Sequence, residues 1–109
     1  MVDYKKLQAM EAAYDSRQRM FKQIEDGLED FQRHFRMRTD FLIDQIYDAY
    51  RGEEIPQDSH HFVYQLQDRV DIFYRDTMTE HDLLDEQRQV EKKRFEYELE
   101  EAYREKEDE

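Results

Sequence analysis

The side chains with the chemistry to bind a metal are four histidines and many carboxylates, and their spacing does not favour a metal site. His60 and His61 are adjacent, so on a helix their side chains diverge by about 100° and are poorly placed to bind one ion together. Neither His34 nor His81 falls in the Glu-x-x-His spacing of di-iron helical bundles. We therefore expect no metal and no other cofactor.

Catalytic residues are equally hard to assemble from this sequence. The absence of cysteine excludes disulfides, thiolate nucleophiles and cysteine metal sites. Paired carboxylates do acid–base chemistry only where burial separates their pKa values, and on a solvated helical face they remain ordinary acids. The sequence has no glycine-rich phosphate loop, no Ser/His/Asp order and no Gly-Lys-Ser/Thr motif. We expect a protein that is not an enzyme.

Composition favours one extended helical domain over the 109 residues. Charged residues make up 42% of the chain and hydrophobic residues 38%, and only 2 glycines and 1 proline are present. This scarcity removes most of the turns that a sheet protein needs. The net charge of -12 opposes binding to nucleic acid or to an anionic membrane, so we expect neither as a partner.

An apolar residue at every seventh position through the first half predicts one long helix, from about residue 3 to residue 50. Its single stripe must lie against another helix. Arg17 and Arg38 interrupt the second apolar row, where a charge either fixes register and partner or extends its stem along the seam with the guanidinium in water. The residues of the stripe are Leu7, Tyr14, Phe21, Leu28, Phe35, Leu42 and Ala49. The carboxylates expected to accept the two arginines are Glu80, Asp82, Asp85 and Glu86.

Residues 51–58 form the predicted turn, because this is the only stretch with both helix breakers. Gly52 can cap the first helix, Pro56 prevents simple continuation, and Asp58 or Ser59 can cap a second helix over residues 59–106. A short loop between two nearly equal helices predicts an all-α antiparallel helical hairpin. In the second helix, residues 85–94 contain one apolar side chain, Val90, and are expected to pack weakly.

Gly27 lies inside the first predicted helix and has two interpretations. Either tertiary packing compensates its low helix propensity, or another backbone passes close to it.

The chain near the turn is apolar on more than one face, whereas a two-helix arrangement covers only one side of each helix. This pattern has two interpretations: helices from another chain complete a bundle, or the aromatic side chains enclose a wider hairpin end. The residues expected to form the shared, partner-binding core are Phe41, Ile46, Tyr47, Tyr50, Gly52, Phe62, Leu66, Val70 and Phe73.

The tripeptide Tyr50-Arg51-Gly52 at the midpoint of the chain resembles the aromatic-x-Gly hinge of the WXG100 proteins of type VII secretion, with tyrosine in place of tryptophan. The segment from Phe95 to Lys106 is similar to the acidic, tyrosine-bearing ends of the small helical proteins encoded beside LXG toxins, the LXG-associated α-helical (Lap) proteins. The resemblance implies a helical hairpin that shares a composite surface with a partner.

The resemblance also implies a Tyr-x-x-x-Asp/Glu export signal near the C-terminus. The candidates are Tyr97 with Glu101 and Tyr103 with Glu107, each pair one helical turn apart on a common face. Because Tyr50 with Glu54 and Tyr64 with Asp68 fit the same spacing, only position near the C-terminus distinguishes the candidates. The alternative is that these are tyrosines on an acidic, solvated helix.

These observations lead us to expect an accessory, chaperone-like protein that binds the helical N-terminal domain of a type VII secretion substrate, an LXG toxin, together with a second small helical protein. The alternatives are a self-associating coiled-coil protein with no secretion role, and an acidic mimic that blocks a basic surface. The start Met1-Val2-Asp3-Tyr4 lacks the basic and apolar regions of a Sec signal peptide, so we expect a cytoplasmic protein, with co-export through type VII secretion as a further expectation.

Overall fold

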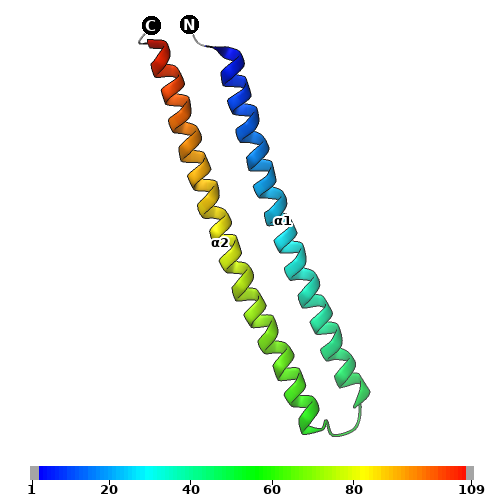
Figure 1. The fold of residues 1–109 in the computed structure, drawn as a ribbon. Coiled ribbons are helices and arrows are strands. Elements are labelled where there is room, and N and C mark those ends of the chain that lie inside the picture. The colour runs from blue at the N-terminus through cyan, green and yellow to red at the C-terminus, as the bar shows by residue number, and fades with distance from the viewer. Residues whose placement is uncertain (1–2, 108–109) are drawn as a thin grey trace. The chain divides into compact units, whose positions relative to one another are not determined.

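A computed structural model describes residues 3–107, with side chains for residues 3–104, and its two elements are both α-helices. Helix α1 spans Tyr4–Ala49 and helix α2 spans Gln57–Glu107. Figure 1 shows these helices and the loop that joins them, and the described residues contain no strand. The predicted all-α class is therefore confirmed.

The start of α1 is fixed by Asp3. The Asp3 carbonyl accepts the Leu7 amide at 3.1 Å, and its Oδ1 accepts the Lys6 amide, also at 3.1 Å. The first bond is the first intrahelical bond of α1, and the second satisfies one of the amides that a helix N-terminus leaves without an intrahelical partner. Asp3 is therefore the N-cap.

The turn contains the glycine cap that the sequence predicts. Helix α1 ends with hydrogen bonds between residues three apart, such as the Tyr50 amide donating to the Tyr47 carbonyl at 3.2 Å. Gly52 then takes a φ of 80°. That left-handed conformation is costly for residues with a Cβ and easy for glycine. Helix α2 begins at Gln57, two residues before the predicted start, because the Pro56 carbonyl already accepts the amides of Ser59 and His60.

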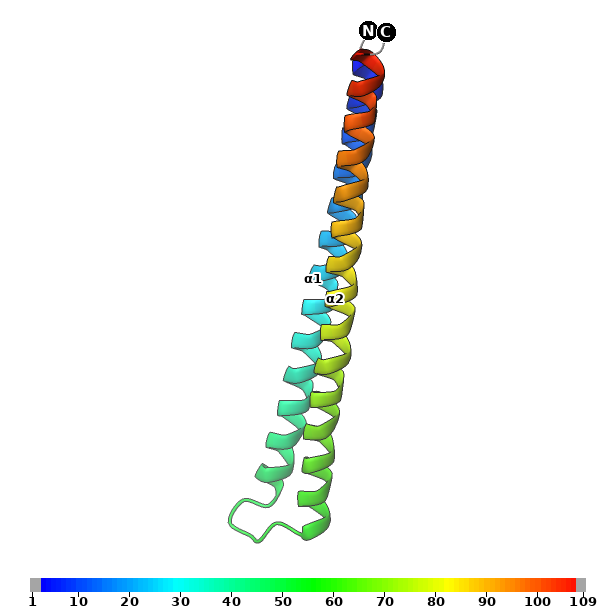
Figure 2. The same cartoon turned by 90° about the vertical axis from the view of Figure 1, so that its left-hand side faces the viewer.

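Contacts divide the chain into two compact units, which we call the turn unit (Gly27–Glu80) and the terminal unit (Met1–Asp26 with His81–Glu109). In the turn unit, the C-terminal half of α1 and the N-terminal half of α2 run antiparallel on either side of the loop (Figures 1 and 2). Phe73 stacks on Phe35 at a centroid distance of 4.3 Å, and Val63 is buried, with 1% of its surface exposed. This unit is a helical hairpin.

The predicted seven-residue stripe is correct as far as Phe35 and wrong beyond it. Leu28 and Phe35 lie half-buried, but Leu42 is 46% exposed and Ala49 is also exposed. A helix with 3.6 residues per turn drifts away from a strict seven-residue repeat, and here the inward row advances in steps of three and four instead. After Phe35, the residues of this inward row are Thr39, Ile43, Ile46 and Tyr50.

The terminal unit also pairs α1 with α2, through the stack of Tyr14 on Phe95 at a centroid distance of 4.2 Å and an interplanar angle of 6°. The expected acceptors are wrong for both arginines. Arg17 Nε donates to Glu91 at 2.9 Å, and Arg38 forms no ion pair with a described residue. A second cross-helix pair joins Arg88 to Glu25. Residues 85–94 therefore contact α1 through ion pairs, while Val90 is 64% exposed.

Over the described part of the chain, neither α1 nor α2 has the apolar length that a membrane crossing requires.

Candidate partner-binding surface

The turn unit leaves most of its large apolar side chains uncovered. Val63 is its one buried apolar residue, and the hairpin seam includes the polar side chains of Thr39 and Thr77, both buried. Thr77 accepts a hydrogen bond from Gln32 across the seam and donates to backbone carbonyls of its own helix. The exposed large apolar residues of this unit are Phe31, Met37, Phe41, Leu42, Tyr47, Phe62, Tyr64, Ile72, Tyr74 and Met78.

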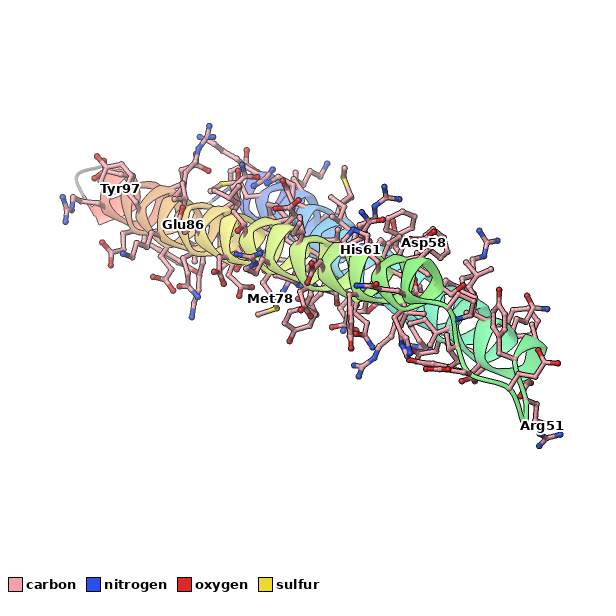
Figure 3. The ribbon with its side chains drawn as sticks, turned by 90° about the horizontal axis from the view of Figure 1, so that it is seen from below. Arg51, Asp58, His61, Met78, Glu86 and Tyr97 are labelled. Atoms are coloured by element: carbon pink, nitrogen blue, oxygen red, sulfur yellow. The ribbon has the colours of Figure 1, made fainter. Side chains whose placement is uncertain are left out.

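The structure divides the residues predicted to bind a partner into three groups. Four of them lie half-buried on the inward rows of the hairpin: Ile46, Leu66, Val70 and Phe73. Three are exposed: Phe41, Tyr47 and Phe62. The remaining two belong to the turn, where Tyr50 is half-buried with its hydroxyl 3.4 Å from Ser59 Oγ, which donates to it, and Gly52 is exposed. Figure 3 shows that the side chain of Arg51, between them, points away from the ribbon.

One face of the turn unit, which we call the arginine face, combines exposed apolar groups with two arginines. On α1 the residues Phe31, Arg38 and Leu42 share a side, because residues seven and eleven apart lie on one side of a helix. The same spacing puts Phe62, Arg69 and Phe73 on one side of α2. The rings of Phe31 and Phe73 meet at a centroid distance of 5.2 Å, so these two sides border each other.

The opposite face of the turn unit holds an open groove of about 610 Å³ between the two helices. Its base is apolar, with Phe35, Ile43 and Val70, and its rim is polar, with charges of both signs. Arg33 on this rim pairs with Asp30 at 3.4 Å. The rim residues of the groove include Glu29, Arg33, Arg36, Asp40, Gln67 and Asp71. Further along this side of α2, the side chain of Met78 projects away from the ribbon (Figure 3).

The candidate export residues lie in the terminal unit. Tyr97 is exposed and Glu101 half-buried, and both line a shallow depression with Lys6 and Met10 of α1. Glu101 accepts an ion-pair bond from Arg104 at 3.4 Å.

The second candidate pair is described only in part. Tyr103 is exposed, and the side chain of Glu107 lies outside the described residues.

Charges in the seam of the terminal unit are the feature that sequence reasoning missed. Arg88 and Glu91 follow Leu84 at steps of four and three, so they continue the inward row of α2 with charged side chains. The hydrogen bond from Arg88 holds the pKa of Glu25 below its ordinary value, and burial opposes this shift. The Asp26 carboxylate raises the pKa of Lys22, with help from Glu25. The steps of three and four were the signal available in the sequence.

No arrangement of acidic and histidine side chains suited to a metal ion occurs within the described residues. Comparison of the chain with protein-family models, with curated proteins and with solved structures finds no match. Function must therefore be inferred from the geometry of the turn unit.

Proposed function

We propose that this protein works by binding a helical partner, whose apolar side chains cover the arginine face of the turn unit. The observation that carries this proposal is the exposure of Phe31 (61%), Leu42 (46%) and Phe62 (49%) on one face of a hairpin that buries a single apolar residue. Exposed large apolar side chains that share one face of a protein often mark an interaction site.

The expected gain from covering this face is substantial. Full burial of a leucine or phenylalanine side chain stabilises by about 1.5–3 kcal/mol relative to full exposure. The three side chains are about half exposed, so a helix packed over them recovers about half of that value for each. An amphipathic helix with residues at three- and four-residue spacing fits between α1 and α2, as in a helical bundle.

In its specific form, the proposal is that the partner is the helical N-terminal domain of a type VII secretion substrate of the LXG class, and that this protein is its accessory. Two features support it. Gly52 with its φ of 80° follows Tyr50 at the turn, in the place of the aromatic-x-Gly hinge. Tyr97 and Glu101 lie on a common depression of the terminal unit, where a secretion component could contact both.

Co-expression with the N-terminal domain of an LXG toxin tests this function. The tagged toxin domain should co-purify with this chain. Leu42→Asp should weaken that complex by about tenfold or more, because it removes an apolar contact and places a carboxylate four residues from Arg38, where it can pair with that arginine. Val90→Asp in the terminal unit is the matched control, since Val90 is also exposed but lies off the proposed surface.

Two results would contradict the proposal. One is a complex that Leu42→Asp and Phe62→Asp leave unchanged. The other is a stable homo-oligomer of the purified chain whose melting does not respond to the toxin domain, which would favour a self-associating coiled-coil protein instead. Substitutions of Leu66 or Phe73 are unsuitable here, because both residues lie in the seam of the hairpin itself.

A further inference from the structure

The register of the turn unit places Arg38 and Arg69 at nearly the same level on the arginine face. The stack of Phe35 on Phe73 and the hydrogen bond from Ser59 to Tyr50 fix the antiparallel register of the turn unit. Between these two contacts, the register places Arg38 level with Val70, one residue from Arg69. Both arginines are exposed, and both lie on the side of their helix that borders the contact of Phe31 with Phe73.

Within the part of the chain that the structure describes, neither arginine has a carboxylate partner. Among the described residues neither forms an ion pair, whereas Arg17, Arg33, Arg88 and Arg94 do. The helical neighbours three and four residues away, where such pairs form, are all uncharged or histidine. For Arg38 these neighbours are His34, Phe35, Phe41 and Leu42, and for Arg69 they are Gln65, Leu66, Ile72 and Phe73.

This arrangement is unusual for a chain that has 29 acidic and 17 basic residues. The nearest carboxylate on this side of α2, Asp76, lies seven residues beyond Arg69, or about 10 Å along the helix. Two like charges are therefore held at one level, with apolar side chains on both sides of them along the face. A hydrophobic surface with two cations at its centre favours a carboxylate at the same place on the surface that covers it.

From this, and resting on the proposed function, we infer that the partner helix carries an aspartate or glutamate inside its apolar stripe, placed to bind Arg38 and Arg69 together. The partner's recognition element is thus an amphipathic helix with apolar residues at three- and four-residue spacing and one acidic residue at its centre. The acidic residue fixes the register in which the helix docks, because any slip leaves two guanidinium groups covered without a counter-charge.

A second copy of this chain fits the face poorly. A two-fold axis that centres the arginine face on itself would bring four guanidinium groups to one level, and like charges in an interface are strongly unfavourable. Pairing of this face with itself about that axis is therefore disfavoured, and the inferred occupant is a different polypeptide with the opposite charge at that position.

A displayed library of amphipathic helices tests the inference directly. Its members keep a fixed leucine stripe at heptad spacing, while the central stripe position and the flanking positions are randomised. Selection on the wild-type chain should enrich aspartate or glutamate at the central position by tenfold or more over leucine. Selection on the double variant Arg38→Glu/Arg69→Glu should enrich lysine or arginine there instead.

The matched control is Arg33→Glu/Arg36→Glu, which makes the same charge change on the rim of the groove at the opposite face. It should select the same acidic residue as the wild type. Circular dichroism of the three proteins establishes that each remains helical.

Two outcomes would overturn the inference, and they differ in what they say of the proposed function. If the selected helices carry leucine at the central position and bind both the wild type and the Arg38/Arg69 variant, the inferred acidic residue is wrong, while the proposal of helix binding stands. If no helix is selected, and the chain instead forms a homodimer that Leu42→Asp dissociates, the arginine face binds a second copy, and both proposals fail.

Discussion

At the scale of single residues, the two glycines provide a matched comparison. A Cβ added at Gly27 or at Gly52 would meet no atom within 4 Å, so space does not distinguish the two positions. Only the backbone does, because Gly52 has a φ of 80° and Gly27 is helical. No other backbone of the described residues therefore approaches Gly27, and within this chain its low helix propensity is the cost that remains.

We expect Gly27→Ala to raise the free energy of unfolding by about 1 kcal/mol, since alanine is the better helix former. Gly52→Ala should lower the same quantity by about 1–2 kcal/mol, because an L-residue is strained in the left-handed region. Urea denaturation followed by circular dichroism measures both. A loss of stability in Gly27→Ala would show that this backbone position has a role that the contacts do not reveal.

The pair of Glu25 with Arg88 makes stability depend on pH. Arg88 lowers the pKa of Glu25 in the folded protein. At pH values above the ordinary pKa of 4.5 the ionised carboxylate therefore stabilises the fold, and this stabilisation is lost as the pH falls through the lowered pKa. The melting temperature of the wild type should exceed that of Glu25→Gln near neutral pH, and the difference should disappear in acid. A difference that stays constant with pH would exclude the ion pair as its source.

At the scale of the helices, the inward row of α1 decides which side chains stabilise the hairpin. Ile43 lies half-buried on that row, while its neighbour Leu42 lies off the row and is 46% exposed. We expect Ile43→Ala to lower the free energy of unfolding of the isolated chain by about 1–2 kcal/mol and Leu42→Ala by about 0.5 kcal/mol or less. Thermal unfolding of the two variants measures this order, and the reverse order would restore the strict seven-residue stripe.

Sequence reasoning predicted the two helices, the turn, the glycine cap and the stripe as far as Phe35. It could not predict the inward positions of Ile43 and Tyr50, because a small drift between the helical repeat and a seven-residue pattern accumulates along α1. It also missed the pairing of Arg17 with Glu91, since that contact depends on the register of the two helices and not on spacing within either one. Sequence reasoning missed the arginine face for the same reason, because the face is formed only when the cross-helix contact of Phe31 with Phe73 brings its two sides together.

At the scale of the whole molecule, the proposed complex combines an apolar contact with a local charge contact. High salt distinguishes such a complex from one held by long-range charge attraction alone. At about 1 M salt the screening length is about 3 Å, so long-range attraction by a net charge of -12 is removed while apolar burial remains. We expect the complex with the toxin domain to persist in high salt in a pull-down. Complete loss of the complex under these conditions would favour the acidic mimic of a basic surface.

The single buried apolar residue of the turn unit, Val63, has a consequence for the life of the protein in a cell. A segment with so little hidden from water opens often, and proteases cleave the opened form. We expect molecules made in excess of their binding partner to be degraded first, so that turnover alone would keep the two polypeptides in matched amounts.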